Sequence, residues 1–365
     1  MSEIVLRIKG KEYGGWTRVN VRKSLYQMTG SFDLETTDTF PGDLKKWDIK
    51  MGDACSVSID KQVIITGYIE DIPISYDATN HSIGFSGRDK TGDLVDCSFT
   101  ETSKEWNNQK IITIIKALCL PFGITVDIDS SVTSKVNEKT PTEQFKINEG
   151  ETAFDTIFRL CKPKGILPVS YGNGKLVLTG TGTQKTKDIL EFGKNILAGS
   201  ITQSDKERYA EYIVKGQGEK TIFNTNADAA QPKGIYQDNL ILETRPWRKI
   251  VIWPDSSCTA GFCKDMAKWE GQNRAGKSRS IDYQVQGWTQ SDGKVWPLNS
   301  LVKVKDSFLG IDGTVWLIAS VNFTIGEGEG TITNLNLVSP DTFKLPPVNP
   351  TKEMSSIFDS LKLIP

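Results

Sequence analysis

Residues 258–287 read CTAGFCKDMAKWEGQNRAGKSRSIDYQVQG, and the order of the elements in this stretch decides which kind of fold it can belong to. Over about 258–273, apolar residues recur at steps of three and four, which predicts an amphipathic helix. Over 281–286, apolar and polar residues alternate, which predicts a strand. The stretch is therefore expected to run from a helix through a turn into a strand.

The turn matches a nucleotide-binding pattern, G-x-x-x-x-G-K-[ST], from Gly271 to Ser278. A working phosphate loop follows a buried strand and opens a helix whose N-terminal amides face the anion. Here the helix comes first, so Gly276 is predicted to end it, with Arg274 and Lys277 near the negative end of the helix dipole. This order argues against ATP or GTP binding.

Length and charge limit the class of protein. The chain has 365 residues, which is enough for two or three domains. Its 44 basic and 45 acidic residues give a net charge of −1, so nothing global attracts nucleic acid or an anionic membrane. No apolar run approaches the ~20 residues of a membrane span, and the N-terminus lacks the features of a signal peptide. We therefore expect synthesis and assembly in the cytosol.

The cysteines and the single histidine offer little for metal or catalytic chemistry. Of the six cysteines only Cys258 and Cys263 are close in sequence, and no histidine is near them, so reduced structural thiols are expected in place of zinc or disulfides. His81 is expected to tip a hairpin, and any triad mechanism would have to use it. No catalytic, cofactor-binding or metal-binding residue is predicted.

The pattern changes twice along the chain. The first hundred residues alternate as antiparallel strands, and helices over 106–120 and 152–162 with a hairpin at Asn173-Gly174 then predict an α+β unit. Strands return beyond Thr181, interrupted by a long polar loop over 223–239.

The predicted fold is α+β, mainly β, with two antiparallel β-barrel domains and an inserted α+β unit. The segments are assigned as follows: 1–100 to the first barrel, 101–180 plus 240–290 to the α+β unit, 181–239 plus 291–345 to the second barrel, and 346–365 to a proline-rich spacer with a short C-terminal helix.

The C-terminal helix is predicted to bind a partner. Its apolar face carries Met354, Ile357, Phe358 and Leu361. A helix this short is marginal alone in water, so it is expected either to fray or to be held by a partner. The proline-rich spacer before it is stiff and suited to carrying the helix to a neighbouring subunit.

Nine sequence blocks carry a family resemblance through their order and spacing. They are Gly15–Val19, Gly30–Leu34, Gly150–Phe154, Gly174–Thr179, Val214–Gln217, Gly271–Ser278, Val285–Trp288, Asp292–Trp296 and Asn299–Val304. Together they resemble the baseplate hub proteins of Mu-like contractile phages, the family that includes the late-control D proteins. The first two blocks are the weakest and the last three the strongest.

The resemblance implies a fold of two tail-tube-like β-barrels with inserted α+β structure. It also implies that three chains form a homotrimeric ring, which joins the six-fold tail tube protein to a three-fold, membrane-piercing central spike beside other baseplate proteins. Such a protein is part of the virion tail baseplate and is assembled in the bacterial host cytoplasm. The resemblance supplies no catalytic residue, no specific recognition of nucleic acid and no membrane span.

Two other functions stay open. A cell-wall hydrolase would need two carboxylates at a defined separation, and the candidates are Glu70-Asp71, Asp127-x-Asp129 and Glu327-x-Glu329. A carbohydrate-binding tail component could use some of the nine Trp and nine Tyr residues, although most fit strand and core patterns.

Two basic clusters are also candidates for a functional surface. They are Arg245 to Lys249, and Arg274 with Lys277 and Arg279. A solvated face is the favoured interpretation, and a ring interface or a bore that passes DNA is the alternative.

Overall fold

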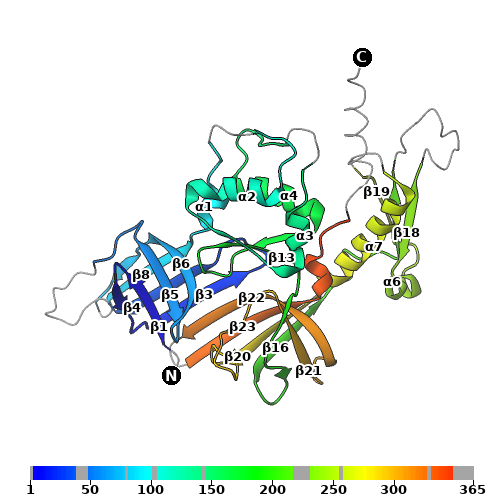
Figure 1. Cartoon of the computed structure of the whole chain (residues 1–365). Coiled ribbons are helices and arrows are strands. Elements are labelled where there is room, and N and C mark those ends of the chain that lie inside the picture. Colours follow the sequence, from blue (N-terminus) through cyan, green and yellow to red (C-terminus); the bar gives the residue numbers. More distant parts are fainter. Residues whose placement is uncertain are drawn as a thin grey trace.

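The computed structural model describes residues 3–37, 48–78, 81–100, 105–140, 145–216, 231–254, 258–326 and 330–347. A 15-stranded sheet dominates them, and two smaller units are attached to it (Figure 1). Among the described helices, none is both long and apolar enough to cross a membrane.

The N-terminal half of the large sheet is antiparallel throughout, as the alternation of its residues predicts. The strands lie in the order β3-β4-β8-β6-β5-β1-β2, with β7 beside β8. They are β1 (Ile4–Ile8), β2 (Lys11–Tyr13), β3 (Arg18–Ser24), β4 (Ser31–Thr37), β5 (Ala54–Ile59), β6 (Gln62–Asp71), β7 (Ile74–Tyr76) and β8 (His81–Asp89). His81 begins β8 opposite Tyr76, beside the predicted hairpin tip.

The C-terminal half continues the same sheet. Its main strands lie in the order β16-β20-β23-β22, and β22 pairs with β3 to join the two halves. They are β14 (Gln184–Lys185), β15 (Leu190–Glu191), β16 (Ile196–Gln203), β20 (Arg279–Gln286), β21 (Ser300–Asp306), β22 (Ile311–Gly326) and β23 (Gly330–Val338). One hydrophobic core runs through both halves, from Leu6 and Phe32 to Phe323 and Leu337.

The first attached unit lies between the two halves in sequence and packs on its own core, which includes Ile114, Leu118 and Ile157. It comprises α1 (Gly92–Asp96), β9 (Glu105–Trp106), α2 (Ile111–Cys119), η1 (Leu120–Phe122), β10 (Val126–Ile128), η2 (Ser130–Val132), α3 (Thr133–Val136), β11 (Phe145–Lys146), α4 (Ala153–Cys161), η3 (Lys162–Lys164), β12 (Leu167–Val169) and β13 (Leu176–Thr179).

The predicted hairpin of this unit is confirmed by the pairing of β12 with β13. The first helix begins later than predicted, at Ile111 and not at Trp106. Asn108 has a left-handed backbone, with φ of 49°, and Lys110 pairs with Lys139 as an isolated bridge. The chain is therefore held out of the helical conformation up to Lys110.

The second attached unit is a three-stranded sheet in the order β18-β17-β19, covered by a long helix. Its elements are β17 (Glu211–Lys215), β18 (Lys233–Gln237), α6 (Asn239–Thr244), β19 (Lys249–Ile252) and α7 (Ala260–Lys277). Tyr212, Val214, Phe262 and Cys263 form its core. The chain then continues from β23 into η4 (Pro340–Phe343), which packs on α7.

The strand pairing corrects the predicted grouping of this region. Residues 211–215 and 233–237 were assigned to the second barrel, the latter within a long loop, but they form β17 and β18 beneath α7. Residues 279–286 were assigned to the α+β unit, but they form β20 of the large sheet. Alternation along a strand shows which face is buried and not which element covers it, so sequence spacing alone could not place these strands. The domain boundaries themselves stay a prediction.

The structure confirms the helix-then-strand order at 271–278 and corrects the role of Gly276. Helix α7 extends to Lys277 with Ser278 as its C-cap, so Gly276 lies inside the helix. A Cβ atom at Gly276 would lie 2.9 Å from the backbone nitrogen of Thr342, and one at Gly271 would lie 2.4 Å from the Tyr236 ring. These glycines permit close packing of neighbouring elements and do not cradle a phosphate.

All six cysteines are free, and only Cys97 is exposed. The sulfur atoms of Cys258 and Cys263 lie 3.3 Å apart in the core of the second unit. Burial raises the pKa of Cys263 to about 12, so its thiol stays protonated near neutral pH.

Candidate functional site

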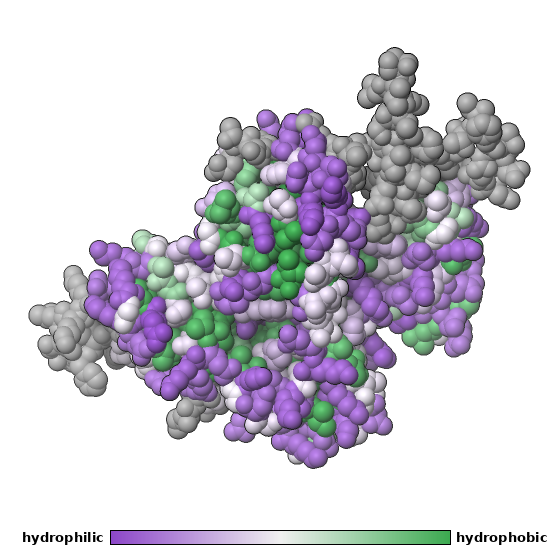
Figure 2. Space-filling model, in the orientation of Figure 1, coloured by the Kyte–Doolittle hydropathy of each residue, from purple (hydrophilic) through white to green (hydrophobic). Residues whose placement is uncertain are grey.

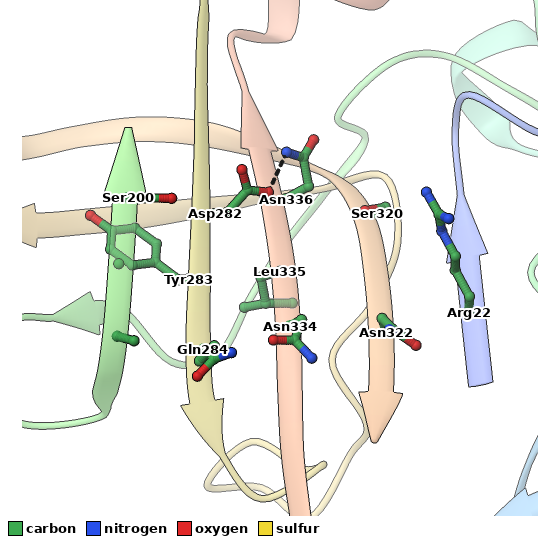
Figure 3. Close-up of a pocket in the computed structure, with 12 residues that line it drawn as sticks. Arg22, Ser200, Asp282, Tyr283, Gln284, Ser320, Asn322, Asn334, Leu335 and Asn336 are labelled. Carbon is green, nitrogen blue, oxygen red and sulfur yellow. Dashed lines mark hydrogen bonds between the residues drawn. The ribbon is translucent and has the colours of Figure 1, made fainter. Parts of the chain in front are cut away.

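The large sheet has one apolar face and one polar face in the region where its halves meet. Along β20, β22 and β23 the side chains of Tyr283, Val321 and Leu335 are buried in the core. Their neighbours, including Asp282, Asn322 and Asn334, point to the other side (Figure 3). We call this outer side the shared polar face, and it is formed by the outward residues of β16, β20, β23, β22, β3, β4 and β8.

Strand register places the polar residues in rows that cross the joint between the halves. One row runs from Gln284 through Asn334 and Asn322 to Arg22 and Ser31. Directly opposed side chains in an antiparallel pair have Cβ atoms about 5 Å apart, so neighbouring residues of the row lie side by side. The shared polar face is therefore continuous over both halves.

Amide groups satisfy much of the hydrogen bonding within this face. Asn336 donates an Nδ2–H group to Asp282 Oδ1 at 2.7 Å (Figure 3). It also donates to Ser280 Oγ at 2.8 Å. Asn20 donates in the same way to Asp33 at 3.2 Å. The side-chain oxygens of Asn20 and Asn322 are buried and accept no hydrogen bond within the described chain.

Two shallow hollows lie on the shared polar face. One, of about 380 Å³, is lined by residues that include Arg22, Asp282 and Asn334. The other, of about 350 Å³, is lined by residues that include Arg18, Asp33 and Glu35. Both signs of charge are present among amides and hydroxyls, and Arg18 pairs with Glu35 at 3.9 Å in the second hollow. Neither hollow therefore concentrates one sign of charge.

Three of the carboxylates considered for glycoside cleavage have structural partners. Arg88 donates to both carboxylate oxygens of Glu70 at 2.8–2.9 Å and also binds Asp96. Asp127 pairs with Lys175 at 3.0 Å. Asp129 caps η2 by accepting from the Ser131 amide at 2.9 Å, and Asp71 ends β6. Glu327 and Glu329 lie outside the described residues.

The basic clusters are largely engaged within the second attached unit. Arg248 donates to the carbonyl oxygen of Lys206 at 2.8 Å, and Lys249 pairs with Glu211 at 2.8 Å. Arg274 pairs with Glu270 at 2.7 Å. Spacing could not have shown these partners, because most come from distant segments. Lys277 is exposed at the end of α7.

The part of the chain that the structure describes contains no group of three or more His, Cys, Asp or Glu residues arranged to hold a metal ion. The predicted partner-binding residues Met354, Ile357, Phe358 and Leu361 lie outside the described residues.

Family models match three parts of the chain. Residues 3–89 match the N-terminal domain of the Mu phage baseplate assembly protein GpP-like family, and residues 91–180 match the second domain of the baseplate hub protein gp44-like family. Residues 259–346 match the fourth domain of the Mu phage baseplate assembly protein GpP.

Whole-chain similarity agrees with these matches. The baseplate hub protein gp44 of Escherichia phage Mu is 29% identical over 347 residues, which cover 94% of this chain and 89% of that protein. The crystal structure of the 43 kDa tail protein of prophage MuSo2 from Shewanella oneidensis is 35% identical, with a TM-score of 0.80 over 94% of this chain and 99% of that one. The chain belongs to the Mu-like phage baseplate hub family.

The membership confirms the resemblance, the mainly β fold class and the structural baseplate role predicted for this hub protein. A tail protein from Neisseria meningitidis MC58 shares the fold at 22% identity, with a TM-score of 0.75 over 93% of this chain and 99% of that one.

The hub protein also exposes an apolar strip that the sequence analysis missed. On the side of the small sheet away from α7, Ile235 and Val251 flank Ile213 in register. Trp253 directly follows the end of β19. Ile235 is 47% exposed and Trp253 63% exposed. The sequence signal is the apolar run from Ile250 to Trp253, which leaves neither face of the strand polar.

Proposed function

We propose that the hub protein acts as a homotrimeric ring that joins the six-fold tail tube to the three-fold central spike of a contractile phage tail. The observation that carries the proposal is the β3–β22 pairing, which fuses two barrel-like halves into one sheet within a single chain. Three chains then present six such halves to the tube and keep three-fold symmetry towards the spike.

The distribution of polar and apolar surface supports a ring. The exposed strip of Ile213, Ile235, Val251 and Trp253 has the apolar character of an interface core. A cyclic arrangement closes when this kind of surface meets a different surface on the next copy. Burying the strip also removes an exposed patch that would favour aggregation.

The shared polar face suits the wall of the central passage. A wall rich in lysine or arginine would retain DNA through its phosphates. Here Arg18 and Arg22 are balanced by Asp33, Glu35 and Asp282 among neutral amides, so DNA would be neither held nor strongly repelled.

A role without catalysis is part of the proposal. Glu70, Asp127 and Asp129 are bound to Arg88, Lys175 and the start of η2, which supports a structural role for these carboxylates. The related hub and tail proteins are structural. We also propose the tail tube protein, the central spike and other baseplate proteins as partners, the virion baseplate as the location and the host cytoplasm as the place of assembly.

The predicted domain order is kept in this proposal with one change of grouping. The second barrel comprises residues 181–203 and 279–345, and residues 204–278 form a separate unit inserted within it. The separate core under α7 supports this division.

Electron microscopy of the purified chain together with its spike tests the ring. Class averages are expected to show a closed particle with a central pore and six similar features around it. A particle of two-fold symmetry, or an open chain of subunits, would contradict the proposal.

A further inference from the structure

An apolar groove of about 600 Å³ lies where three parts of the molecule meet, and its volume is within the roughly 300–1,000 Å³ of pockets that take a ligand or peptide side chains. Tyr26 and Met28 line it from the β3–β4 link, Phe154 and Phe158 from α4, and Leu167 from β12. Met28 and Leu167 are buried, whereas Tyr26 is 56% exposed. Figure 2 shows hydrophobic residues at the surface of the first attached unit.

The last described segment is fixed at the rim of this groove. Trp269 donates its indole N–H to the carbonyl oxygen of Lys344 at 2.7 Å, and Asn273 donates to that of Thr342 at 2.8 Å. The ring of Phe343 packs on Tyr26 with centroids 5.1 Å apart. Leu345 and Pro346 then line the groove itself. The described part of the chain therefore ends beside an apolar surface.

The residues that follow carry a complementary pattern. Met354, Ile357, Phe358 and Leu361 are spaced as i, i+3, i+4 and i+7, which is the anchor spacing of a helix that docks in an apolar groove. Eight residues of helix span about 12 Å, so the four anchors would lie close together on one face of the helix.

The proline-rich spacer before the anchors determines whether they reach the groove of the same chain or that of a neighbouring chain. Pro346, Pro347 and Pro350 favour an extended chain, and the six residues 348–353 reach roughly 19 Å in that conformation. An extended spacer carries the anchors away from the groove at its own base, and towards the next subunit of a ring.

We propose that this groove binds residues 354–361 of a neighbouring copy of the chain, so that the C-terminal segment of each subunit binds the next subunit of the ring. The proposal rests on the ring put forward above and adds a specific contact to it. Phe154 and Phe158 contact one side of the bound segment, and Tyr26 and Phe343 contact the other side.

Peptide binding tests the groove directly. A fluorescent peptide of residues 351–365 is titrated against the chain that lacks those residues, with binding followed by anisotropy. Saturable binding is expected, weakened about ten-fold or more by Phe158→Asp or Tyr26→Asp in the groove and by Phe358→Asp in the peptide. Tyr26 is largely exposed, so its variant is expected to fold even if Phe158→Asp does not. Phe308→Asp, at a 79% exposed site outside the groove, is the matched control and should leave affinity unchanged.

Single-cysteine variants decide between a neighbour and the same chain. In a Cys97→Ser background, which removes the one exposed thiol, Phe158→Cys and Phe358→Cys are placed on separate chains and mixed under mild oxidation. A disulfide-linked product of twice the chain mass is expected. The proposal would be overturned if that product is absent and a disulfide forms only within a chain that carries both substitutions.

The experiments distinguish an error in the proposed groove contact from an error in the proposed hub function. If the peptide does not bind, or if groove variants leave its affinity unchanged, the inference is wrong. If a closed ring nevertheless forms with the spike, the proposed hub function stands without it.

Discussion

Asn322 lies directly opposite Arg22 across the β22–β3 pair, at the point where the C-terminal half of the large sheet continues into the N-terminal half. On the other side of the same strands, Phe323 and Val21 are fully buried in one core. The joint is thus polar on one face and part of the hydrophobic core on the other, and it couples the two halves into one folding unit.

Phe323→Ala should destabilise both halves together. Removing a fully buried aromatic side chain costs about 3–5 kcal/mol of unfolding free energy. Urea unfolding followed by tryptophan fluorescence and by circular dichroism should give one shifted transition by both probes. Phe308→Ala, at a site 79% exposed, should change the unfolding free energy by no more than about 0.5 kcal/mol. Separate transitions for the two probes in Phe323→Ala would show that the joint does not couple the halves.

Lys23 should make stability depend on pH. Its side chain lies on the core side of β3, with Nζ 5.8 Å from the centroid of the Phe323 ring, and burial lowers its pKa to about 8 although Asp89 opposes the shift. Between pH 8 and its ordinary value of about 10.4, the unfolded chain binds more protons here than the folded chain. This group therefore makes the protein more stable as pH rises through that window, by at most about 1.4 kcal/mol per pH unit.

Lys23→Met removes this titration. The variant should be more stable than the parent protein at pH 7, where the parent carries a buried charge, and the difference should shrink between pH 8 and 9.5. Urea unfolding at each pH measures it. A difference that does not change with pH would show that Lys23 keeps an ordinary pKa.

Gly276→Ala should destabilise the protein although alanine is the better helix former. A Cβ atom there meets the backbone of Thr342 at 2.9 Å, and such overpacking costs about 1–3 kcal/mol. Gly261→Ala is the matched control in the same helix, because its nearest neighbour would be 3.8 Å away, and it should stabilise by about 0.5–1 kcal/mol. Thermal unfolding compares them, and equal signs would refute the packing role.

Nucleotide should not bind at 271–278. The pattern is helical as far as Lys277, so its amides bond within α7 and do not face a ligand. Calorimetric titration with ATP or GTP should give no saturable heat, and Lys277→Ala should leave folding intact. Micromolar affinity that is lost in Lys277→Ala would reverse this interpretation.

Removal of residues 351–365 should leave both halves of the sheet folded while weakening assembly. The large sheet packs on a core that runs from Ile4 to Leu337, and the unfolding midpoint of the isolated chain is expected to stay unchanged. Sedimentation over a range of concentrations should show weaker association. Unchanged association would mean that the segment is not a docking element.

Local features were the part of the structure that the sequence could predict. The helix–strand order around Gly271–Ser278, the β12–β13 hairpin and the alternation of the N-terminal strands all follow from residue periodicity and turn chemistry.

The contacts between elements could not be predicted in this way. Gly276 resembled a helix terminus because the partner that requires a glycine, Thr342, is 66 residues away in sequence, the difference between 342 and 276. Strand β17 was assigned to the wrong sheet because its alternating Tyr212 and Val214 fit any apolar cover. The shared polar face likewise depends on the β3–β22 register, which no local pattern encodes.

The central claim is that three copies of this chain close a ring, and the mass of the particle tests it most directly. Light scattering of the purified chain, alone and with its spike, is expected to give a hub mass about three times the 40.5 kDa of one chain, whether the trimer forms alone or only with the spike. A mass of one chain at high concentration with the spike present, or a stable mass of two chains, would contradict the account.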